Sequence, residues 1–158
     1  MNTIIYREIK YNSSEYKDAL DLRNRVLRVP LGLCLFDADL SSEINDLHFG
    51  AFFKEKIVGV VSMVQKSSSH YQLRQFAVDP SFQKKGIGRN LLRFVENAIP
   101  NMLPVEITLH ARDIAVPFYE KCGYSSLDDH FFEIGIPHTA MQKYLPVGSS
   151  DNHCLIIG

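Results

Sequence analysis

Apolar and polar residues alternate along several short segments of the 158-residue chain, and this period of two is typical of β-strands. The pattern is clearest in "PVEITLH", where Val105, Ile107 and Leu109 alternate with polar residues. Asp79-Pro80 follows another such segment, and the proline is expected to end that strand. Further strands are expected at Thr3–Ile9, in "DLHFGAFF" and "KIVGVVSMVQK", at Tyr71–Asp79, and in "FFEIGI" and "TAMQKYL".

Three other segments show the three-to-four-residue apolar spacing of amphipathic helices. The first follows "NSSEY", with Ser13 or Ser14 as the expected N-cap and Pro30 as the expected end. The third is "RDIAVPFYEKCG", in which Asp113 is the expected cap and Gly123 the expected end. The second carries the longest apolar stripe and is closed by a proline; its stripe is Ile87, Leu91, Leu92, Val95, Ala98 and Ile99.

The order of these elements predicts the fold class. The two segments around Lys54-Glu55 are expected to form a hairpin. A helix joins the Tyr71–Asp79 strand to the Val105–His110 strand, and such a crossover makes two strands parallel. We therefore expect an α+β protein with a mixed sheet. Residues 1–146 are expected to form a single domain, and residues 147–158 a loosely attached tail.

Composition and charge exclude several classes of partner. The chain has 17 Lys and Arg against 18 Asp and Glu, so 17 − 18 gives a net charge of −1, and we expect neither nucleic acid nor membrane as a partner. No apolar run approaches the roughly 18 residues that span a bilayer. Cys34, Cys122 and Cys154 lack metal-type spacing, so we expect no metal, no disulfide framework and a cytoplasmic location.

The stretch "FQKKGIGRN" lies between the expected Tyr71–Asp79 strand and the long helix. Gly86 and Gly88 permit positive φ and close backbone approach, and the first turn of a helix offers free N–H groups to an anion. Lysines and an arginine add positive charge, so a phosphate or pyrophosphate is the expected ligand. The P-loop and dinucleotide-binding patterns are both absent. A tight structural turn without a ligand remains the alternative.

At these residues the sequence resembles the GNAT (Gcn5-related N-acetyltransferase) superfamily. "LRQFAVDPSFQKKGIGRNLLRFVENA" matches the family's Q/R-x-x-G-x-G/A strand–loop–helix at Gln83, Gly86 and Gly88. "LHARDIAVPFYEKCGY" resembles the family's A-x-x-F-Y-x-x-x-G-F/Y segment, and "FFEIGIPHTAMQKYL" resembles a bacterial branch with E-x-G-I-P-H-x-x-M. The resemblance covers nearly all of residues 1–145.

The resemblance implies a GNAT fold, with a mixed and mostly antiparallel sheet of about seven strands flanked by helices and splayed at the parallel central pair. It implies an N-acetyltransferase that moves an acetyl group from acetyl-CoA, as co-substrate, directly to a primary amine of a small molecule or peptide. A catalytically silent acyl-CoA-binding sensor or accessory domain is the alternative. Family members are often monomers or homodimers, so either state is expected here.

The resemblance also implies which residues hold the acyl donor. The backbone of Phe76, Ala77 and Val78 would pair with the pantetheine arm as an added strand. The family often has Asn before the last helix, where this chain has Asp113, so that contact is in question; Arg112 is a substitute. The residues expected around the pyrophosphate are Gln83, Lys84, Lys85, Gly86, Ile87, Gly88 and Arg89.

For catalysis, the resemblance implies that Tyr119 protonates the departing CoA thiolate and that the Val78 N–H polarises the thioester carbonyl. A packed core tyrosine is the alternative for Tyr119. Candidates for the base are His138 first and His110 second, because imidazole titrates near neutral pH. Glu106, which shares a strand face with His110, Glu133 and a chain of waters are further alternatives.

The acceptor is expected to be recognised by residues outside these motifs. Arg23, Arg25 and Arg28 crowd one helix, where they are suited to a carboxylate or phosphate on the acceptor, or form a solvated basic face. The Leu31–Asp46 loop and an expected Asp128–Phe132 connection are the segments expected to choose the acceptor.

Overall fold

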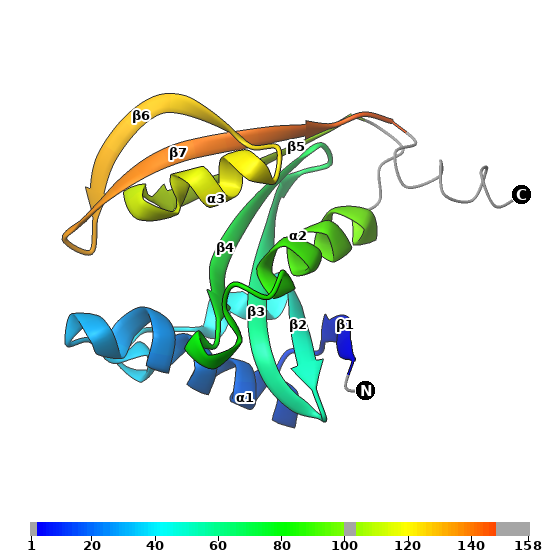
Figure 1. Cartoon of the computed structure of the whole chain (residues 1–158), viewed down its shortest axis with the longest axis vertical. Helices are drawn as coiled ribbons and strands as arrows, with labels where there is room; N and C mark the ends of the chain where they lie inside the picture. The colour runs from blue at the N-terminus through cyan, green and yellow to red at the C-terminus, as the bar shows by residue number, and fades with distance from the viewer. Residues whose placement is uncertain (1–2, 100–103, 148–158) are drawn as a thin grey trace, which may run out of the picture. The chain divides into compact units, whose positions relative to one another are not determined.

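The computed structural model describes residues 3–99 and 104–147, drawn as ribbons in Figure 1. Seven strands form a sheet in the order β1-β2-β3-β4-β5-β7-β6. The β4–β5 pair is parallel, whereas β1–β2, β2–β3, β5–β7 and β6–β7 are antiparallel. The predicted α+β class, with a mixed sheet flanked by helices and a parallel central pair, is confirmed.

The main elements lie close to their predicted positions. The helices are α1 (Ser14–Arg23), α2 (Ile87–Ala98) and α3 (Val116–Lys121). The strands are β1 (Ile4–Ile9), β2 (Leu47–Phe53), β3 (Lys56–Ser67), β4 (His70–Val78), β5 (Val105–Arg112), β6 (Ser125–Glu133) and β7 (Ile136–Leu145).

Internal contacts divide the chain into two compact units. Unit 1 consists of Met1–Val64 and Gln75–Val95, and unit 2 of Gln65–Arg74 and Glu96–Gly158. The domain boundary expected after residue 146 stays a prediction, and the tail from residue 148 onward lies outside the described residues.

In unit 1, α1 begins where the sequence predicted. The Ser13 hydroxyl accepts a hydrogen bond from the Tyr16 N–H at 3.1 Å, as an N-cap does. The expected end at Pro30 is wrong, because the α-helix ends at Arg23 and continues as a π-helical turn, Asn24–Arg28. Pro30 instead lies at the start of a 3₁₀ turn, Val29–Leu31, where its missing N–H is no loss.

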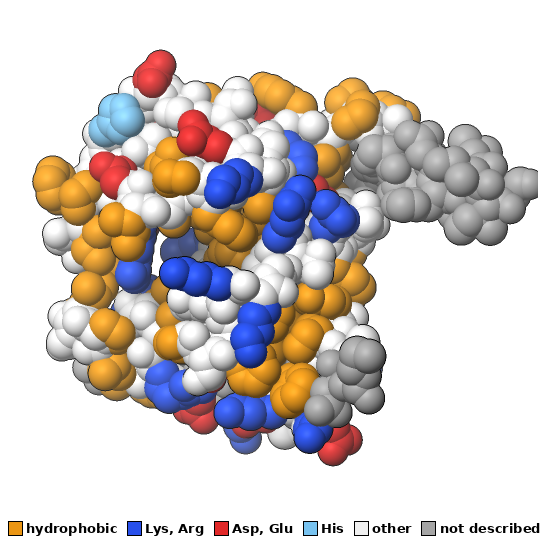
Figure 2. Space-filling model, in the orientation of Figure 1, with side chains coloured by type: hydrophobic (Ala, Val, Ile, Leu, Met, Phe, Trp, Pro, Cys, Tyr) orange, Lys and Arg blue, Asp and Glu red, His pale blue; other side chains and the backbone are white. Residues whose placement is uncertain are grey.

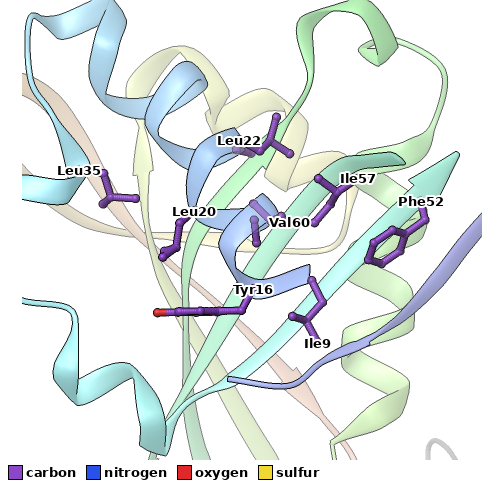
Figure 3. Close-up of a cluster of buried hydrophobic side chains, with 10 residues drawn as sticks. Ile9, Tyr16, Leu20, Leu22, Leu35, Phe52, Ile57 and Val60 are labelled. Carbon is purple, nitrogen blue, oxygen red and sulfur yellow. The ribbon is translucent and has the colours of Figure 1, made fainter. Parts of the chain in front are cut away.

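The core of unit 1 packs α1 against the strands. Figure 3 shows Tyr16, Leu20 and Leu22 of α1 lying among side chains from the sheet. The hairpin predicted at Lys54-Glu55 is confirmed, with φ of 50° and 68° at these two residues, as a two-residue turn of the right twist requires. The buried members of the cluster are Ile9, Tyr16, Ala19, Leu20, Leu22, Leu35, Phe52, Ile57, Val60 and Ala77.

The apolar stripe predicted for α2 is confirmed except at one position. Ile87, Leu91, Leu92 and Val95 are buried in the helix, and Ile99 is buried just after it. Ala98, by contrast, is exposed. The helical repeat of 3.6 residues explains the difference, because Ile99 lies four residues after Val95 and takes the inward position in place of Ala98.

In unit 2, β5 shows the predicted alternation, with Val105, Ile107, Leu109 and Ala111 buried. Helix α3 follows a 3₁₀ turn, Asp113–Ala115, and ends near Gly123, which has a φ of 96°. The expected Asp113 cap is wrong. Ala115 is the N-cap of α3 and makes no side-chain hydrogen bond to it, because the Asp113 carboxylate accepts from Thr139 instead.

The last hairpin differs from the prediction in its register. β6 begins at Ser125 and ends at Glu133, whereas the sequence placed a strand at "FFEIGI" and a loop at Asp128–Phe132. Ile134 and Gly135 make the turn, with φ of 45° and 75°. A register shift between Ser126 and His130 bends β6, and Figure 1 shows the strand arching away from β7.

Candidate functional site

The C-terminal end of β4 is irregular where the acyl donor was expected to pair. The parallel register with β5 runs from His70↔Glu106 to Leu73↔Leu109 and ends there. Gln75 then adopts a positive φ of 56°, which is rare for a non-glycine residue inside a strand. Phe76, Ala77 and Val78 follow in unit 1, with Ala77 buried and the two flanking residues half-buried.

The turn after β4 is held by local hydrogen bonds. The Asp79 carboxylate accepts from the Ser81 N–H at 2.9 Å, and the Asp79 N–H donates to the Val58 carbonyl at 2.8 Å. The Gln83 side-chain amide donates to the Val78 carbonyl at 3.0 Å. The family-motif glutamine therefore ties the turn to the end of β4.

Two residues of this turn have left-handed backbone conformations: Lys84, with a φ of 62°, and Gly86, with a φ of 81°. Gly86 is exposed, and a Cβ there would come no closer to other atoms than 4.0 Å, from Asn90. Gly88 was also expected to use positive φ, but it lies in the first turn of α2 and does not.

The turn is exposed and basic. Lys84, Lys85 and Arg89 are exposed, and the first turn of α2 contains no acidic residue. In Figure 2, Lys and Arg side chains lie over the region where Figure 1 draws the connection from β4 to α2. Free helical N–H groups and positive charge suit a phosphate-bearing ligand, so the residues present fit the pyrophosphate predicted from the sequence.

Tyr119 lies in α3 of unit 2 and is buried. Burial raises the pKa of its phenol above the usual value, with Cys122 adding to the shift and Arg112 opposing it. The phenol therefore keeps its proton across the neutral range. Its ring contacts Phe118 and Tyr124, with centroid distances of 5.2 and 6.0 Å.

His110, Glu133 and His138 come together on β5, β6 and β7 of unit 2. His110 Nδ1 lies 2.9 Å from Glu133 Oε1, and His138 Nε2 lies 3.8 Å from Glu133 Oε2. The Phe131 ring contacts both imidazoles, at centroid distances of 4.7 and 6.0 Å. We call these three titratable residues the His–Glu–His cluster.

The two histidines of the His–Glu–His cluster differ in exposure. His110 has 41% of its side chain exposed and His138 only 5%. His138 was expected at a turn but lies in β7, where its Nδ1 donates to the Ile136 carbonyl at 2.8 Å. The other candidate, Glu106, lies on the same face of β5 as His110, as predicted.

Asp113 and the three arginines have partners of their own. Asp113 accepts from the Thr139 hydroxyl at 2.8 Å, so this carboxylate serves the fold of unit 2. Arg23 was expected to face an acceptor but is 2% exposed and binds Glu43 through both terminal nitrogens, at 2.8 and 2.7 Å. Arg25 is half-exposed and lies 3.6 Å from Asp79.

Sequence reasoning missed the polar network around Glu43. Tyr16 donates to the Glu43 carboxylate at 2.7 Å, and His48 Nε2 donates to the Glu43 backbone carbonyl at 2.8 Å. Burial opposes ionisation of this carboxylate, but the hydrogen bonds and charge of Arg23 prevail and lower its pKa. No local pattern marks these residues, since up to 27 positions separate the partners.

Two further searches cover residues 3–99 and 104–147. No helix in these ranges is long and apolar enough to cross a membrane. The same residues contain no group of three or more His, Cys, Asp or Glu side chains that is suited to hold a metal ion. Cys34 and Cys122 are free thiols.

Comparison with known protein sequences assigns the chain to a family. A family model described as "Acetyltransferase (GNAT) domain" matches residues 36–145. The uncharacterized N-acetyltransferase YjcF of Bacillus subtilis is 30% identical over 140 residues, which cover 85% of this chain and 96% of that protein.

Solved structures share the fold at lower identity. A putative N-acetyltransferase from Lactobacillus plantarum superposes with a TM-score of 0.73 at 18% identity, covering 91% of this chain and 98% of that one. Escherichia coli ElaA gives 0.71 at 17% identity, covering 90% and 99%. An aminoglycoside 6'-N-acetyltransferase complexed with coenzyme A gives 0.68 at 18% identity, covering 90% and 98%. The chain therefore belongs to the GNAT family of acyl-CoA-dependent N-acyltransferases.

Proposed function

We propose that the protein transfers an acetyl group from acetyl-CoA directly to a primary amine of a small molecule or peptide. The observation that carries the proposal is the turn between β4 and α2, which is exposed, basic and left-handed at Lys84 and Gly86. Family membership supports the same reaction, and a fold neighbour was solved with coenzyme A.

The donor would be held by backbone groups of unit 1. We assign the pantetheine arm to Phe76, Ala77 and Val78, after the point where the parallel register ends, because pantetheine amides pair with a strand as a peptide does. The Val78 N–H is the group proposed to polarise the thioester carbonyl. The residues assigned to the pyrophosphate are Gln83, Lys84, Lys85, Gly86, Ile87, Gly88 and Arg89.

Proton transfer would fall to residues of unit 2. Tyr119 is proposed to donate a proton to the departing thiolate, and the raised pKa of its buried phenol keeps that proton in place at neutral pH. His110 and His138 are the candidates to take the proton from the attacking amine. His110 is the more accessible of the two, since its side chain is largely exposed and that of His138 is buried.

Calorimetric titration with acetyl-CoA tests the proposal. In Gly86→Asp a carboxylate would stand where the pyrophosphate is expected, so we expect binding to weaken at least about tenfold. Gly32→Asp is the matched control, because Gly32 in unit 1 also has a positive φ, 72°, and open space around its Cβ position. It introduces the same charge and the same backbone strain in the same unit.

Binding by wild type and by Gly32→Asp, with loss in Gly86→Asp, is the expected result. Absence of binding by folded wild-type protein would contradict both the transferase and the silent acyl-CoA sensor. Equal binding by all three proteins would leave the β4–α2 turn as a structural feature and move the donor site elsewhere.

A further inference from the structure

The His–Glu–His cluster contains a carboxylate that the proposed reaction has not yet used. We infer that Glu133 is a positioning residue that fixes the tautomer of His110, so that the outward-facing Nε2 of His110 can accept the proton of the attacking amine. The inference rests on the proposed transfer to an amine and assigns the base within it.

The hydrogen bonds determine which nitrogen carries the proton. A carboxylate oxygen only accepts, so His110 Nδ1, at 2.9 Å from Glu133 Oε1, must be the donor. In neutral His110 the lone pair is then on Nε2, and 41% of the side chain is exposed. A carboxylate that orients a general-base histidine in this way is a recurrent catalytic arrangement.

His138 completes the arrangement from inside. Its Nδ1 donates to the Ile136 carbonyl, and its Nε2 points toward the second oxygen of Glu133 at 3.8 Å. Both nitrogens therefore face protein groups, and only 5% of the side chain is exposed. His138 is placed to hold Glu133, whereas His110 is placed to meet a substrate.

The neighbouring side chains leave the cluster room to form. In the β5–β7 register His110 lies opposite Ala140, whose small side chain does not fill the space above β7. Phe131 packs edge-on against His110, with ring centroids 4.7 Å apart. The charged or titratable residues on this face of β4, β5 and β7 besides the cluster are His70, Glu106, Arg112 and Tyr144.

Three variants and a matched control test the role of Glu133. Glu133→Ala removes the hydrogen-bond acceptor, and Glu133→Gln keeps a carbonyl oxygen of the same reach but no charge. Asp129→Asn is the control, because it removes one negative charge from the exposed part of the same strand. His110→Gln assigns the imidazole signals of His110.

The tautomer of His110 is the direct readout, measured by ¹⁵N NMR of the imidazole nitrogens at a pH where the ring is neutral. We expect the proton on Nδ1 in wild type, in Asp129→Asn and in Glu133→Gln, and a mixture of both tautomers in Glu133→Ala. The same tautomer distribution in wild type and Glu133→Ala would overturn the inference.

Turnover supplies the second readout, with an amino acid, a polyamine and an aminoglycoside as acceptors and thiol release from acetyl-CoA as the signal. We expect kcat to fall at least about tenfold in Glu133→Ala and less in Glu133→Gln, with the KM for acetyl-CoA unchanged within about twofold. Equal kcat in Glu133→Ala and Asp129→Asn would contradict the inference. A wild type that acetylates none of the three amines, although it binds acetyl-CoA, would contradict the proposed function, and the tautomer alone would then decide the role of Glu133.

Discussion

Glu43 in unit 1 and Glu133 in unit 2 each join side chains from separate elements, yet they differ in burial. Glu43 is buried and binds Arg23 and Tyr16, at 2.7–2.8 Å. Glu133 is 47% exposed and binds one exposed histidine while facing a buried one. The carboxylate with both oxygens enclosed holds α1 to the segment before β2, whereas the carboxylate open to solvent is available to a substrate.

The comparison teaches how to separate structural from functional polar residues in this family member. A buried ion pair contributes through the cost of breaking it, since an unpaired charge in the interior is strongly unfavourable. An exposed pair contributes little to stability, so its geometry is better explained by chemistry. Arg23, expected from the sequence to meet an acceptor, belongs to the first class.

The largest expected effect follows from breaking the Arg23–Glu43 pair. Arg23→Met leaves the Glu43 carboxylate buried without its counter-charge, and we expect the free energy of unfolding to fall by about 3–5 kcal/mol. Arg25→Met is the control, because Arg25 is half-exposed in its contact with Asp79 and should lose no more than about 1 kcal/mol. Urea unfolding at neutral pH measures both.

Replacing both partners sharpens this result. The double variant Arg23→Met with Glu43→Leu removes both charges together, so it should recover most of the loss, apart from about 1 kcal/mol for the Tyr16 hydroxyl. A double variant as unstable as Arg23→Met alone would show that packing, and not the unpaired charge, explains the loss.

The dependence of stability on pH separates the two carboxylates further. The pKa of Glu43 is lowered in the folded protein, so its contribution is present above the unfolded-state value of about 4.3 and is lost as pH falls through the folded value. Glu43→Gln should therefore be less stable than wild type at pH 7, and the gap should narrow below about pH 4.3. A gap that is constant with pH, measured by urea unfolding, would contradict the ionised pair.

The smallest expected effect on stability belongs to Glu133. Because the side chain is nearly half-exposed, Glu133→Ala should change the free energy of unfolding by less than about 1 kcal/mol. The loss of turnover expected of this variant would then be separable from unfolding. A loss of several kcal/mol in urea unfolding would place Glu133 in the same class as Glu43.

Local patterns predicted most of the fold. The alternation in β5, the Ser13 cap of α1, the turn at Lys54-Glu55 and the stripe of α2 are each determined by neighbouring residues, and each was found. The bend of β6 and the π-helical turn after Arg23 were missed. Both depend on contacts with distant segments, which a local pattern does not carry.

The candidate site was predictable to the same extent. The β4–α2 turn is one continuous motif, and the sequence identified it. The His–Glu–His cluster comes from three strands, and sequence reasoning named each member as a separate candidate base without predicting that Glu133 contacts His110. The burial of Arg23 depends on Glu43, 20 residues away, and no spacing rule joins that pair.

Release of CoA thiol from acetyl-CoA in the presence of amine acceptors tests the account most directly, with wild type, Tyr119→Phe and Tyr124→Phe compared. Tyr124 is also a buried tyrosine with a raised pKa, but its hydroxyl donates to Glu96 and serves the fold. We predict amine-dependent release by wild type and Tyr124→Phe, and a fall of about hundredfold in Tyr119→Phe with acetyl-CoA binding retained. Binding of acetyl-CoA by wild type without release toward any amine would contradict the account and favour a silent acyl-CoA sensor.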